Sequence, residues 1–518
     1  MADHVVLDGM TLNPALVHRI AHGASVSLAS GVVERMGLGR RVVDRYLNES
    51  IPAYGLTTGL GMRADQMLTS DAAAEFSYRM VRGRAQAVGA LLSPAEVRAV
   101  MAVRINTMLN GAAGASSEIA PSLVQAINTG FVAAMPKVGS IGTGDLVAMA
   151  CLAHALIGEG EALVGNQRVP ATDGLAAVGL ASLRLLPKDG MVLCNNTAFS
   201  TALASLASVA ARTTLGALQI AGALSIHGFV GNLTPFSAAS LRARPQPGQV
   251  EAGDQIRQLL ADGPLGSPGA ARRLQDPLSF RCMAQLHGSS FAALRDLDEE
   301  LDVDLNSSPD NPVVIIDEDL CVSTGNFQLP RLTQTLDALA RGLAWCATDS
   351  VSRVQRLMNS AHSGLAPLLS SDTPDTAGFG PLLKPMEALR AEIVHLSNPV
   401  PVLASHNADG IEDSVTFAAL AATKLAELVD KVDLIVAFEL VAACQAVDLR
   451  TGGPLAEGPD ISPSLVPVYA AVRNVCRFLA EDRPIGREIE AIARDLVATG
   501  VLISAAGLTA SSQHASTT

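Results

Sequence analysis

Aromatic side chains are scarce in this sequence of 518 residues. Phe, Trp and Tyr together make up 3% of the chain, and there is a single Trp. Hydrophobic residues still account for 49%, so the apolar content is mostly Ala, Leu and Val. Such a composition favours closely packed helices, and the length is sufficient for a large core and for two or three domains.

The chain also has no excess of positively charged residues. The chain has 37 Lys and Arg residues against 50 Asp and Glu residues, which gives a formal net charge of −13. Nucleic acids and anionic membrane surfaces are themselves negatively charged and would repel such a chain. We therefore expect neither as a partner, whereas binding of a small-molecule substrate depends only on the local charge of its site.

Paired cysteines and targeting signals are absent as well. The seven cysteines are scattered without a CxxC pair, which predicts a reduced, cytoplasmic chain with no structural metal. Met1-Ala-Asp-His lacks the basic start and apolar run of a signal peptide. The most apolar segments, 201–226 and 432–447, are interrupted by Arg212 and Glu439 and are predicted to be buried core helices rather than membrane spans.

Helical patterns dominate what is present. Ser93-Pro94-Ala95-Glu96 combines a cap, a proline in the first turn and a glutamate that can reach back, so it predicts a helix start. Apolar spacing predicts long helices over 197–226, 332–358 and 416–449. Residues 242–268 are rich in Pro, Gly, Asp and Gln and are predicted to form an irregular excursion between core helices. The sequence thus predicts an all-α bundle.

Strand signals are few and short. The two β candidates are residues 167–170, and residues 313–316 together with 321–323. Between the helical patterns, one glycine-rich segment stands out: Gly139-Ser-Ile-Gly-Thr-Gly-Asp-Leu146. Its glycines favour a tight loop that leads into a helix, with Asp145 near the first turn. The glycine spacing fits neither a Walker loop nor a dinucleotide fingerprint, so no phosphate site is predicted.

This segment resembles the signature of the aromatic amino acid ammonia-lyases, the family of the histidine and phenylalanine ammonia-lyases. There, a Gly-Ser-Val-Gly-Ala-Ser-Gly-Asp-Leu segment cyclises its own Ala-Ser-Gly into the electrophile methylidene-imidazolone. The loop here is one residue shorter, and Thr143 stands where the dehydrating serine is expected. The resemblance runs from about residue 50 to residue 420 through a series of motifs in the family's order.

The first of these motifs supply a base and a carboxylate-binding residue. Tyr54 lies in Tyr-Gly-Leu-Thr-Thr-Gly-Leu-Gly, similar to the family's Tyr-Gly-Ile-Asn-Thr-Gly-Phe-Gly, which implies the base for a carbon-bound proton. Asn195, in Leu-Cys-Asn-Asn-Thr, matches the active-site asparagine, although a helix cap would also explain it. Arg281, in Gln-Asp-Pro-Leu-Ser-Phe-Arg-Cys, matches the residue that holds the substrate carboxylate, with a structural salt bridge as the alternative. Leu278 replaces the family's tyrosine in this motif.

The remaining matches surround the substrate in the family. Asn311, in Ser-Pro-Asp-Asn-Pro, and Phe327, in Gly-Asn-Phe, match a polar residue and a wall of the site. Lys384 lies in a segment that matches the pocket lining, with a surface lysine as the alternative. Glu412 matches the glutamate that faces the substrate imidazole in the histidine branch, with a helix-entry carboxylate as the alternative. Arg84 stands where that branch has a histidine and is predicted to bind substrate.

The matching and differing residues together predict the chemistry. Tyr54, Arg281 and Glu412 can remove a β proton, bind a carboxylate and face an imidazole-like ring, whereas the electrophile is lost. A trimethylammonium group needs no electrophile, because it has no lone pair to capture and leaves as a neutral amine. Lys384 would hold thiolate character on a ring sulfur. We therefore expect an ergothionase-like lyase that converts ergothioneine to thiourocanate and trimethylamine without a cofactor. Its catalytic residues would be Tyr54, Lys384 and Glu412. Hercynine is the alternative substrate.

Two other functions stay open. Thr143 could itself cyclise between its glycines, which would give an ordinary ammonia-lyase or aminomutase, and a non-catalytic homologue could simply bind betaines. The resemblance implies a long helical bundle of the ammonia-lyase/fumarase type, with active-site loops in an N-terminal domain over 1–200. The bundle and C-terminal helices would occupy 201–518. It also implies a homotetramer whose active sites combine several subunits.

Overall fold

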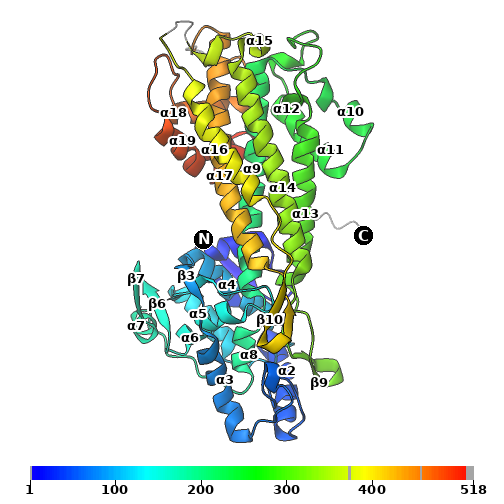
Figure 1. The fold of residues 1–518 in the computed structure, drawn as a ribbon, viewed down its shortest axis with the longest axis vertical. Helices are drawn as coiled ribbons and strands as arrows, with labels where there is room; N and C mark the ends of the chain where they lie inside the picture. The colour runs from blue at the N-terminus through cyan, green and yellow to red at the C-terminus, as the bar shows by residue number, and fades with distance from the viewer. Residues whose placement is uncertain (1–2, 371–374, 455–457, 509–518) are drawn as a thin grey trace. The chain divides into compact units, whose positions relative to one another are not determined.

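The computed structural model describes residues 3–370, 375–454 and 458–508. Its secondary structure is mostly helical with short strands, which confirms the all-α prediction (Figure 1). The chain divides into two compact units, each made of three separate segments. Unit 1 consists of Met1–Val209, Leu297–Leu336 and Pro399–Thr423, and unit 2 of Ala210–Asp296, Asp337–Asn398 and Lys424–Thr518.

Short helices form the N-terminal part of unit 1. They are α1 (Pro14–Ala21), α2 (Val32–Asn48), α3 (Ser70–Arg84), α4 (Pro94–Met108), α5 (Ile119–Thr129), α6 (Leu146–Leu156), α7 (Ala171–Ala177) and α8 (Asp189–Cys194). Helix α4 starts with the predicted reciprocal cap: the Ser93 hydroxyl accepts from the Glu96 N–H at 3.2 Å, and the Glu96 carboxylate accepts from the Ser93 N–H at 2.6 Å.

The strands form small ladders between these helices. Four are two-stranded: β1 (His4–Leu7) with β2 (Ser25–Leu28), β3 (Val88–Leu91) with β5 (Pro136–Val138), β8 (Val313–Ile315) with β9 (Leu320–Val322), and β10 (Ala404–Asn407) with β11 (Glu412–Ser414). In the fifth, β6 (Glu161–Val164) lies between β4 (Val132–Ala133) and β7 (Gln167–Pro170) and pairs with both. Only β1 and β2 run parallel among these described pairs. The strand predicted at 167–170 is confirmed, and those at 313–316 and 321–323 are confirmed to within one residue at each end.

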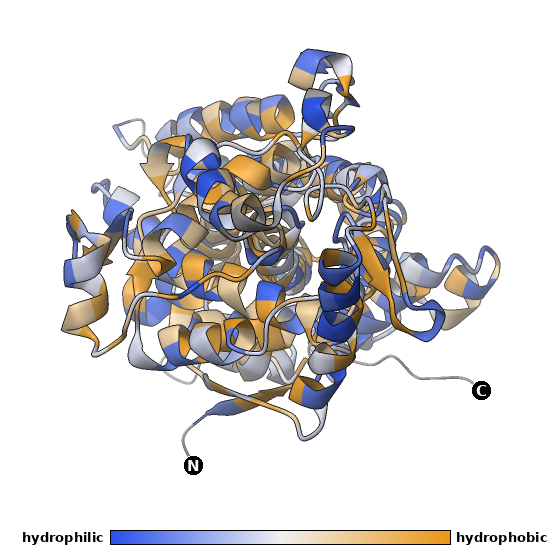
Figure 2. Ribbon diagram, turned by 90° about the horizontal axis from the view of Figure 1, so that it is seen from below, coloured by the Kyte–Doolittle hydropathy of each residue, from blue (hydrophilic) through white to orange (hydrophobic). Residues whose placement is uncertain are grey.

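Four long helices carry the chain between segments of the two units: α9 (Ala198–Phe229), α13 (Met283–Leu305), α14 (Pro330–Met358) and α17 (Ala418–Arg450). They confirm the helices predicted over 197–226, 332–358 and 416–449 to within a turn. Along α14 the leucines at helical spacing are fully buried, at Leu332, Leu336, Leu339 and Leu343. Figure 2 shows polar and apolar residues alternating along the helices, as expected for amphipathic helices that bury one face.

The other helices of unit 2 are shorter. They are α10 (Ala238–Arg242), α11 (Pro247–Leu259), α12 (Leu278–Arg281), α15 (Ser360–Ser363), α16 (Leu383–Leu396), α18 (Val466–Val475), α19 (Gly486–Ile492) and α20 (Val501–Ala505). The prediction of an irregular 242–268 segment is wrong in its centre, because α11 occupies it. Pro247 stands in the first turn, where it is tolerated, and Ala252, Ile256 and Leu259 are buried at helical spacing.

Within the part of the chain that the structure describes, one helical stretch has the length and apolarity of a membrane span. It runs from Asp189 to Phe229, and 72% of its most apolar window is buried inside the protein. A core helix of a folded domain meets the same criteria of length and composition. The burial agrees with the core helix predicted for this segment.

Candidate active site

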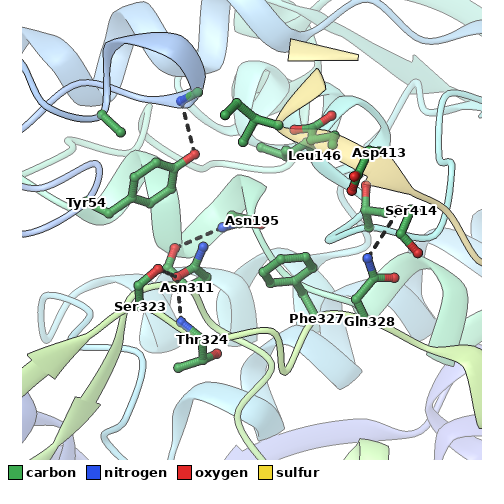
Figure 3. Close-up of a pocket in the computed structure, with 15 residues that line it drawn as sticks. Tyr54, Leu146, Asn195, Asn311, Ser323, Thr324, Phe327, Gln328, Asp413 and Ser414 are labelled. Atoms are coloured by element: carbon green, nitrogen blue, oxygen red, sulfur yellow. Dashed lines mark hydrogen bonds between the residues drawn. The ribbon is translucent and has the colours of Figure 1, made fainter. Parts of the chain in front are cut away.

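Unit 1 contains a pocket of about 320 Å³ that gathers several of the predicted residues (Figure 3). Segments far apart in the sequence contribute Tyr54, Asn195, Asn311, Phe327 and Glu412 to its lining. Thr143, from the glycine-rich loop, lines the same pocket and is only 6% exposed. The fold therefore brings a phenol, two amides, a carboxylate and an aromatic ring to one cavity beside that loop.

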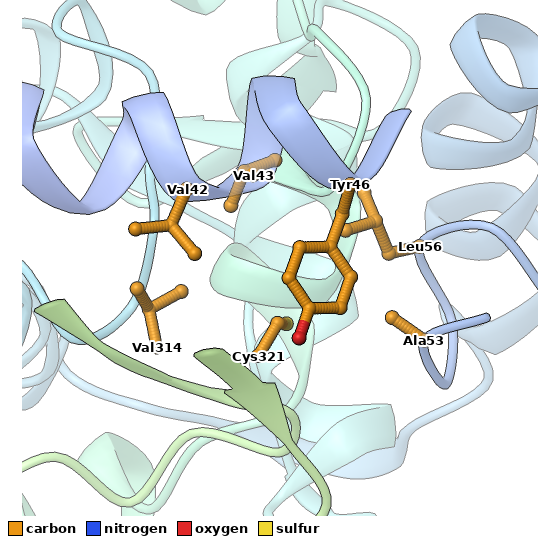
Figure 4. Packing of buried hydrophobic residues seen from close by; sticks show 7 residues of the cluster. All are labelled: Val42, Val43, Tyr46, Ala53, Leu56, Val314 and Cys321. Carbon is orange, nitrogen blue, oxygen red and sulfur yellow. The ribbon is translucent and has the colours of Figure 1, made fainter. Parts of the chain in front are cut away.

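The loop that carries Tyr54 is anchored through its neighbours Ala53 and Leu56, which belong to a hydrophobic cluster (Figure 4). Ala53 and Leu56 flank it and are buried against Tyr46 of α2 and Cys321 of β9, among the cluster Val42, Val43, Tyr46, Ala53, Leu56, Val314 and Cys321. The Tyr54 hydroxyl oxygen accepts a hydrogen bond from the Gly61 N–H at 3.2 Å. The buried neighbours fix the loop, so the phenol itself is free to face the pocket.

The glycine-rich loop is shaped by close contacts that only glycine permits. Gly142 and Gly144 have φ of 78° and 82°, in the left-handed region. A Cβ on Gly142 would lie 2.2 Å from the Thr416 hydroxyl oxygen, and a Cβ on Gly144 would lie 2.4 Å from the Asn195 side-chain oxygen. The Thr416 hydroxyl donates to the Gly142 carbonyl oxygen at 2.8 Å. Thr416 therefore holds the loop in place and leaves no room for a larger residue at position 142.

Asp145 ties the same loop to helix α9. It occupies the N-cap position of α6, near the first turn as predicted, but its carboxylate makes hydrogen bonds to helix α9. The carboxylate accepts from the Ser200 N–H and hydroxyl, both at 2.8 Å, and from the Ser140 hydroxyl. Burial raises the pKa of Asp145, while these hydrogen bonds lower it. The first turn of α9 and the loop are thus fixed by one buried side chain.

The residues present do not fit the electrophile that the family makes from Ala-Ser-Gly. Thr143 stands in place of the serine that dehydrates, and Gly142 replaces the alanine and accepts the Thr416 hydroxyl at its carbonyl oxygen. The alanine side chain itself has no space because of the same threonine. Thr143 is also paired with Gln328 in an antiparallel β-bridge. These contacts hold a loop that has Gly-Thr where the family has Ala-Ser.

Asn195 and Asn311 form a connected polar wall. Asn195 ends α8, and its amide nitrogen donates to the Asn311 carbonyl oxygen at 2.9 Å, so it does more than cap a helix. The Asn311 side-chain oxygen accepts from the Ser323 hydroxyl at 3.1 Å and from the Thr324 N–H at 3.0 Å. These bonds leave the Asn311 amide nitrogen with no protein acceptor among the described residues. It is a donor available to a ligand.

Glu412 lies on β11 rather than at a helix entry. Burial raises the pKa of its carboxyl, and the nearby Arg84 guanidinium lowers it. Arg84 ends α3 and acts on the site through this charge; it does not itself line the described pocket. Gln328, which the sequence analysis missed, lines the pocket next to Phe327 and donates to the Ser414 carbonyl oxygen at 3.2 Å.

Two predicted residues belong to unit 2. Arg281 is the last residue of α12, and both of its terminal N–H groups donate to the Gln275 amide oxygen, at 2.8 and 2.9 Å, in the amide orientation that pairs donors with acceptors. Within the described residues it makes no ion pair, so the alternative of a structural salt bridge is not what holds it. Lys384 is exposed in the first turn of α16. The pocket of unit 1 is lined without either residue.

Comparison with known proteins places the chain in a family. A family model described as aromatic amino acid lyase matches residues 12–474. The chain belongs to the aromatic amino acid lyase family. Members of this family are carbon–nitrogen lyases that act on small molecules. Among the described residues no group of three or more His, Cys, Asp and Glu side chains could hold a metal ion.

The relatives of this aromatic amino acid lyase differ in their substrates. The histidine ammonia-lyase of Anaeromyxobacter dehalogenans is 34% identical over 511 residues, which cover 96% of this chain and 99% of the relative. A crystal structure of ergothionase from Treponema denticola, in complex with desmethyl-ergothioneine sulfonic acid, has a TM-score of 0.90 and 26% identity over 97% of this chain and 100% of that one. Histidine ammonia-lyase from Trypanosoma cruzi has a TM-score of 0.89 and 28% identity, over 97% and 95%.

Proposed function

We propose that this lyase eliminates trimethylamine from a trimethylammonium betaine of histidine, with ergothioneine as the preferred substrate and thiourocanate as the product. One observation carries the proposal: the loop has Gly142-Thr143 in place of Ala-Ser, with no space for the alanine beside Thr416, while Tyr54 and Glu412 remain in the pocket. An enzyme with a base but no electrophile requires a nitrogen that departs unaided. A quaternary ammonium group meets this requirement.

The proposed reaction is a β-elimination. The Tyr54 oxygen, as phenolate, takes the proton from the β carbon, and the electrons of that C–H bond form the Cα–Cβ double bond. The C–N bond breaks with its electron pair going to nitrogen, so trimethylamine leaves neutral and the proton stays on Tyr54 until solvent removes it. The aromatic faces of Tyr54 and Phe327, both lining the pocket, suit a trimethylammonium cation.

The other predicted residues act on the two ends of the substrate. Glu412 would accept an N–H of the imidazole ring, and the amides of Asn195 and Asn311 border the pocket where a carboxylate can bind. Arg281 would bind that carboxylate and Lys384 the ring sulfur. As the family resemblance implies, we propose that these two unit 2 residues reach the pocket of another copy in a homotetramer.

All seven cysteines are free, which supports the proposed cytoplasmic location.

A substrate panel tests the proposal directly. Purified protein is incubated separately with ergothioneine, hercynine and histidine, and release of trimethylamine or ammonia is measured. We expect trimethylamine from ergothioneine and no ammonia from histidine, because only the quaternary nitrogen leaves without capture. Ammonia from histidine at a comparable rate would refute the proposal.

Replacing Lys384 with methionine separates the two betaines. If its ammonium stabilises negative charge on the ring sulfur, Lys384→Met should lower kcat/KM for ergothioneine by about 100-fold, the loss of one charge-assisted hydrogen bond, and change hercynine turnover by less than about threefold. Steady-state kinetics on both substrates provide the measurement. Lys424→Met, at a half-buried lysine of unit 2, is the control, and equal losses on both betaines would contradict a role at sulfur.

A second candidate is histidine ammonia-lyase activity, favoured by the 34% identity to that enzyme over nearly the whole chain. It would require Gly142-Thr143-Gly144 to cyclise without the alanine and serine of the family's triplet. Intact-protein mass spectrometry distinguishes the two, because cyclisation removes two waters from the chain. We expect the unmodified mass.

A further inference from the structure

Lys188, the residue before α8, is a buried cation without a carboxylate partner. It is 3% exposed, and in the described part of the chain it makes no ion pair. Its ammonium donates to the carbonyl oxygens of Ala113, at 2.6 Å, and Pro312, at 3.1 Å. Burial lowers the pKa of this ammonium, and the nearby Cys321 and Asp310 counteract the shift. A lysine buried on backbone carbonyls is uncommon, so the segment that it binds indicates its role.

Lys188 binds the segment that contains Asn311 of the pocket. Pro312 directly follows Asn311, whose own carbonyl oxygen accepts from Asn195. On the other side of Asn311, the Asp310 carboxylate is bound by Arg104, with nitrogen–oxygen distances of 2.7 and 3.2 Å. Three consecutive residues are therefore held, Asp310 by its side chain and Asn311 and Pro312 by their carbonyl oxygens, and two of the three contacts come from buried basic side chains.

These contacts leave the side-chain amide nitrogen of Asn311 available to a ligand. Its side-chain oxygen is taken by Ser323 and Thr324, and its carbonyl oxygen by Asn195. The amide nitrogen, without a protein acceptor in the described chain, belongs to a residue that lines the pocket (Figure 3). A donor fixed in this way costs little ordering entropy when it binds an anionic oxygen.

We propose that Lys188 is a positioning residue of the active site: by holding the Pro312 carbonyl, its ammonium fixes Asn311 so that the Asn311 amide donates to the substrate carboxylate. Lys188 does not touch the substrate. The inference rests on the proposed function only in assuming a substrate with a carboxylate, which every substrate considered above carries. A lysine that merely stabilised the fold would affect all ligands of the pocket alike.

The test compares a carboxylate ligand with its neutral counterpart. Binding of urocanate and of urocanamide is measured by titration calorimetry on the full-length protein and on Lys188→Met. We expect urocanate to bind about 10-fold more weakly to the variant, the equivalent of one hydrogen bond to a charged group, and urocanamide to change by less than about twofold. In turnover, KM should rise with kcat nearly unchanged.

Arg98→Met is the matched control, because Arg98 also donates to backbone carbonyls of unit 1, those of Ile20 and Ala24 at 2.9 Å, but none of these lies in the pocket lining. It should weaken neither ligand. If Lys188→Met does not fold, Lys188→Gln takes its place. Equal weakening of both ligands, unchanged urocanate binding or no urocanate binding by the unaltered protein would each overturn the inference. Failure of the betaine assay alone would refute the proposed function and leave this result standing.

Discussion

Tyr54→Phe is expected to lower kcat for ergothioneine by about 10²- to 10⁴-fold, the range over which a positioned general base contributes. The phenol oxygen is the group in the pocket that we propose takes the β proton, and phenylalanine preserves the ring while removing that oxygen. Substrate binding should change little, because the ring still packs on its loop and the oxygen acts only in the transition state. Stopped assays of trimethylamine release, with KM determined in parallel, provide the measurement.

Tyr78→Phe provides a matched control. The Tyr78 hydroxyl accepts the Leu185 N–H at 3.0 Å, as the Tyr54 hydroxyl accepts the Gly61 N–H at 3.2 Å, so each variant loses the same type of hydrogen bond in unit 1. Both should lose roughly 0.5–1.5 kcal/mol of stability. Only Tyr54→Phe should lose turnover. If Tyr54→Phe retained more than about a tenth of kcat, the base would have to be another group.

The site residues that sequence could predict are those that lie inside contiguous motifs. Tyr54 with its glycines and Phe327 after Gly-Asn each carry a local pattern, and the structure brings both to the pocket. Gln328, next to Phe327, could have been found by extending the same motif by one residue. Glu412 and Asn195 were predicted from their motifs as well, but their hydrogen-bond partners and burial come only from the fold.

Contacts between distant segments could not be predicted in this way. The Gly142 carbonyl and the Thr416 hydroxyl are 274 positions apart in sequence, and neither residue type alone indicates the bond. The role of Lys188 depends likewise on a carbonyl 124 positions away. A shorter loop and a threonine suggested from sequence that the electrophile is lost. The lack of space for the family's alanine at position 142 comes from a tertiary contact.

The fold was predictable where one physical signal dominated. Long apolar stripes at helical spacing identified α9, α14 and α17. For residues 242–268 two signals competed: Pro, Gly and polar residues indicated a loop, whereas the buried positions from Ala252 to Leu259 follow a helix. Tertiary burial decided in favour of α11, because a proline in the first turn does not oppose a helix.

Glu439→Gln is expected to destabilise unit 2 by about 3–5 kcal/mol, the cost of leaving a buried charge without its partner. Glu439, whose charge argued against a membrane span, is fully buried and binds Arg353 of α14 through nitrogen–oxygen contacts of 2.5 and 2.8 Å. It also accepts the hydroxyls of Ser225 in α9 and Ser350 in α14. A neutral amide would leave the Arg353 guanidinium uncompensated and place N–H groups against N–H groups. Urea unfolding followed by circular dichroism measures the loss.

We expect the large loss because this ion pair is buried; an ion pair at the surface should contribute little to stability. Arg494 and Asp495 form an equally close pair on the surface, with two contacts of 2.8 Å, and Asp495→Asn should leave the urea midpoint unchanged. The double replacement Arg353→Met with Glu439→Leu removes both buried charges and should recover most of the stability lost by Glu439→Gln. If the double variant were no more stable than the single one, the loss would have to be attributed to the serine hydroxyls and to packing, because an uncompensated guanidinium would then contribute nothing.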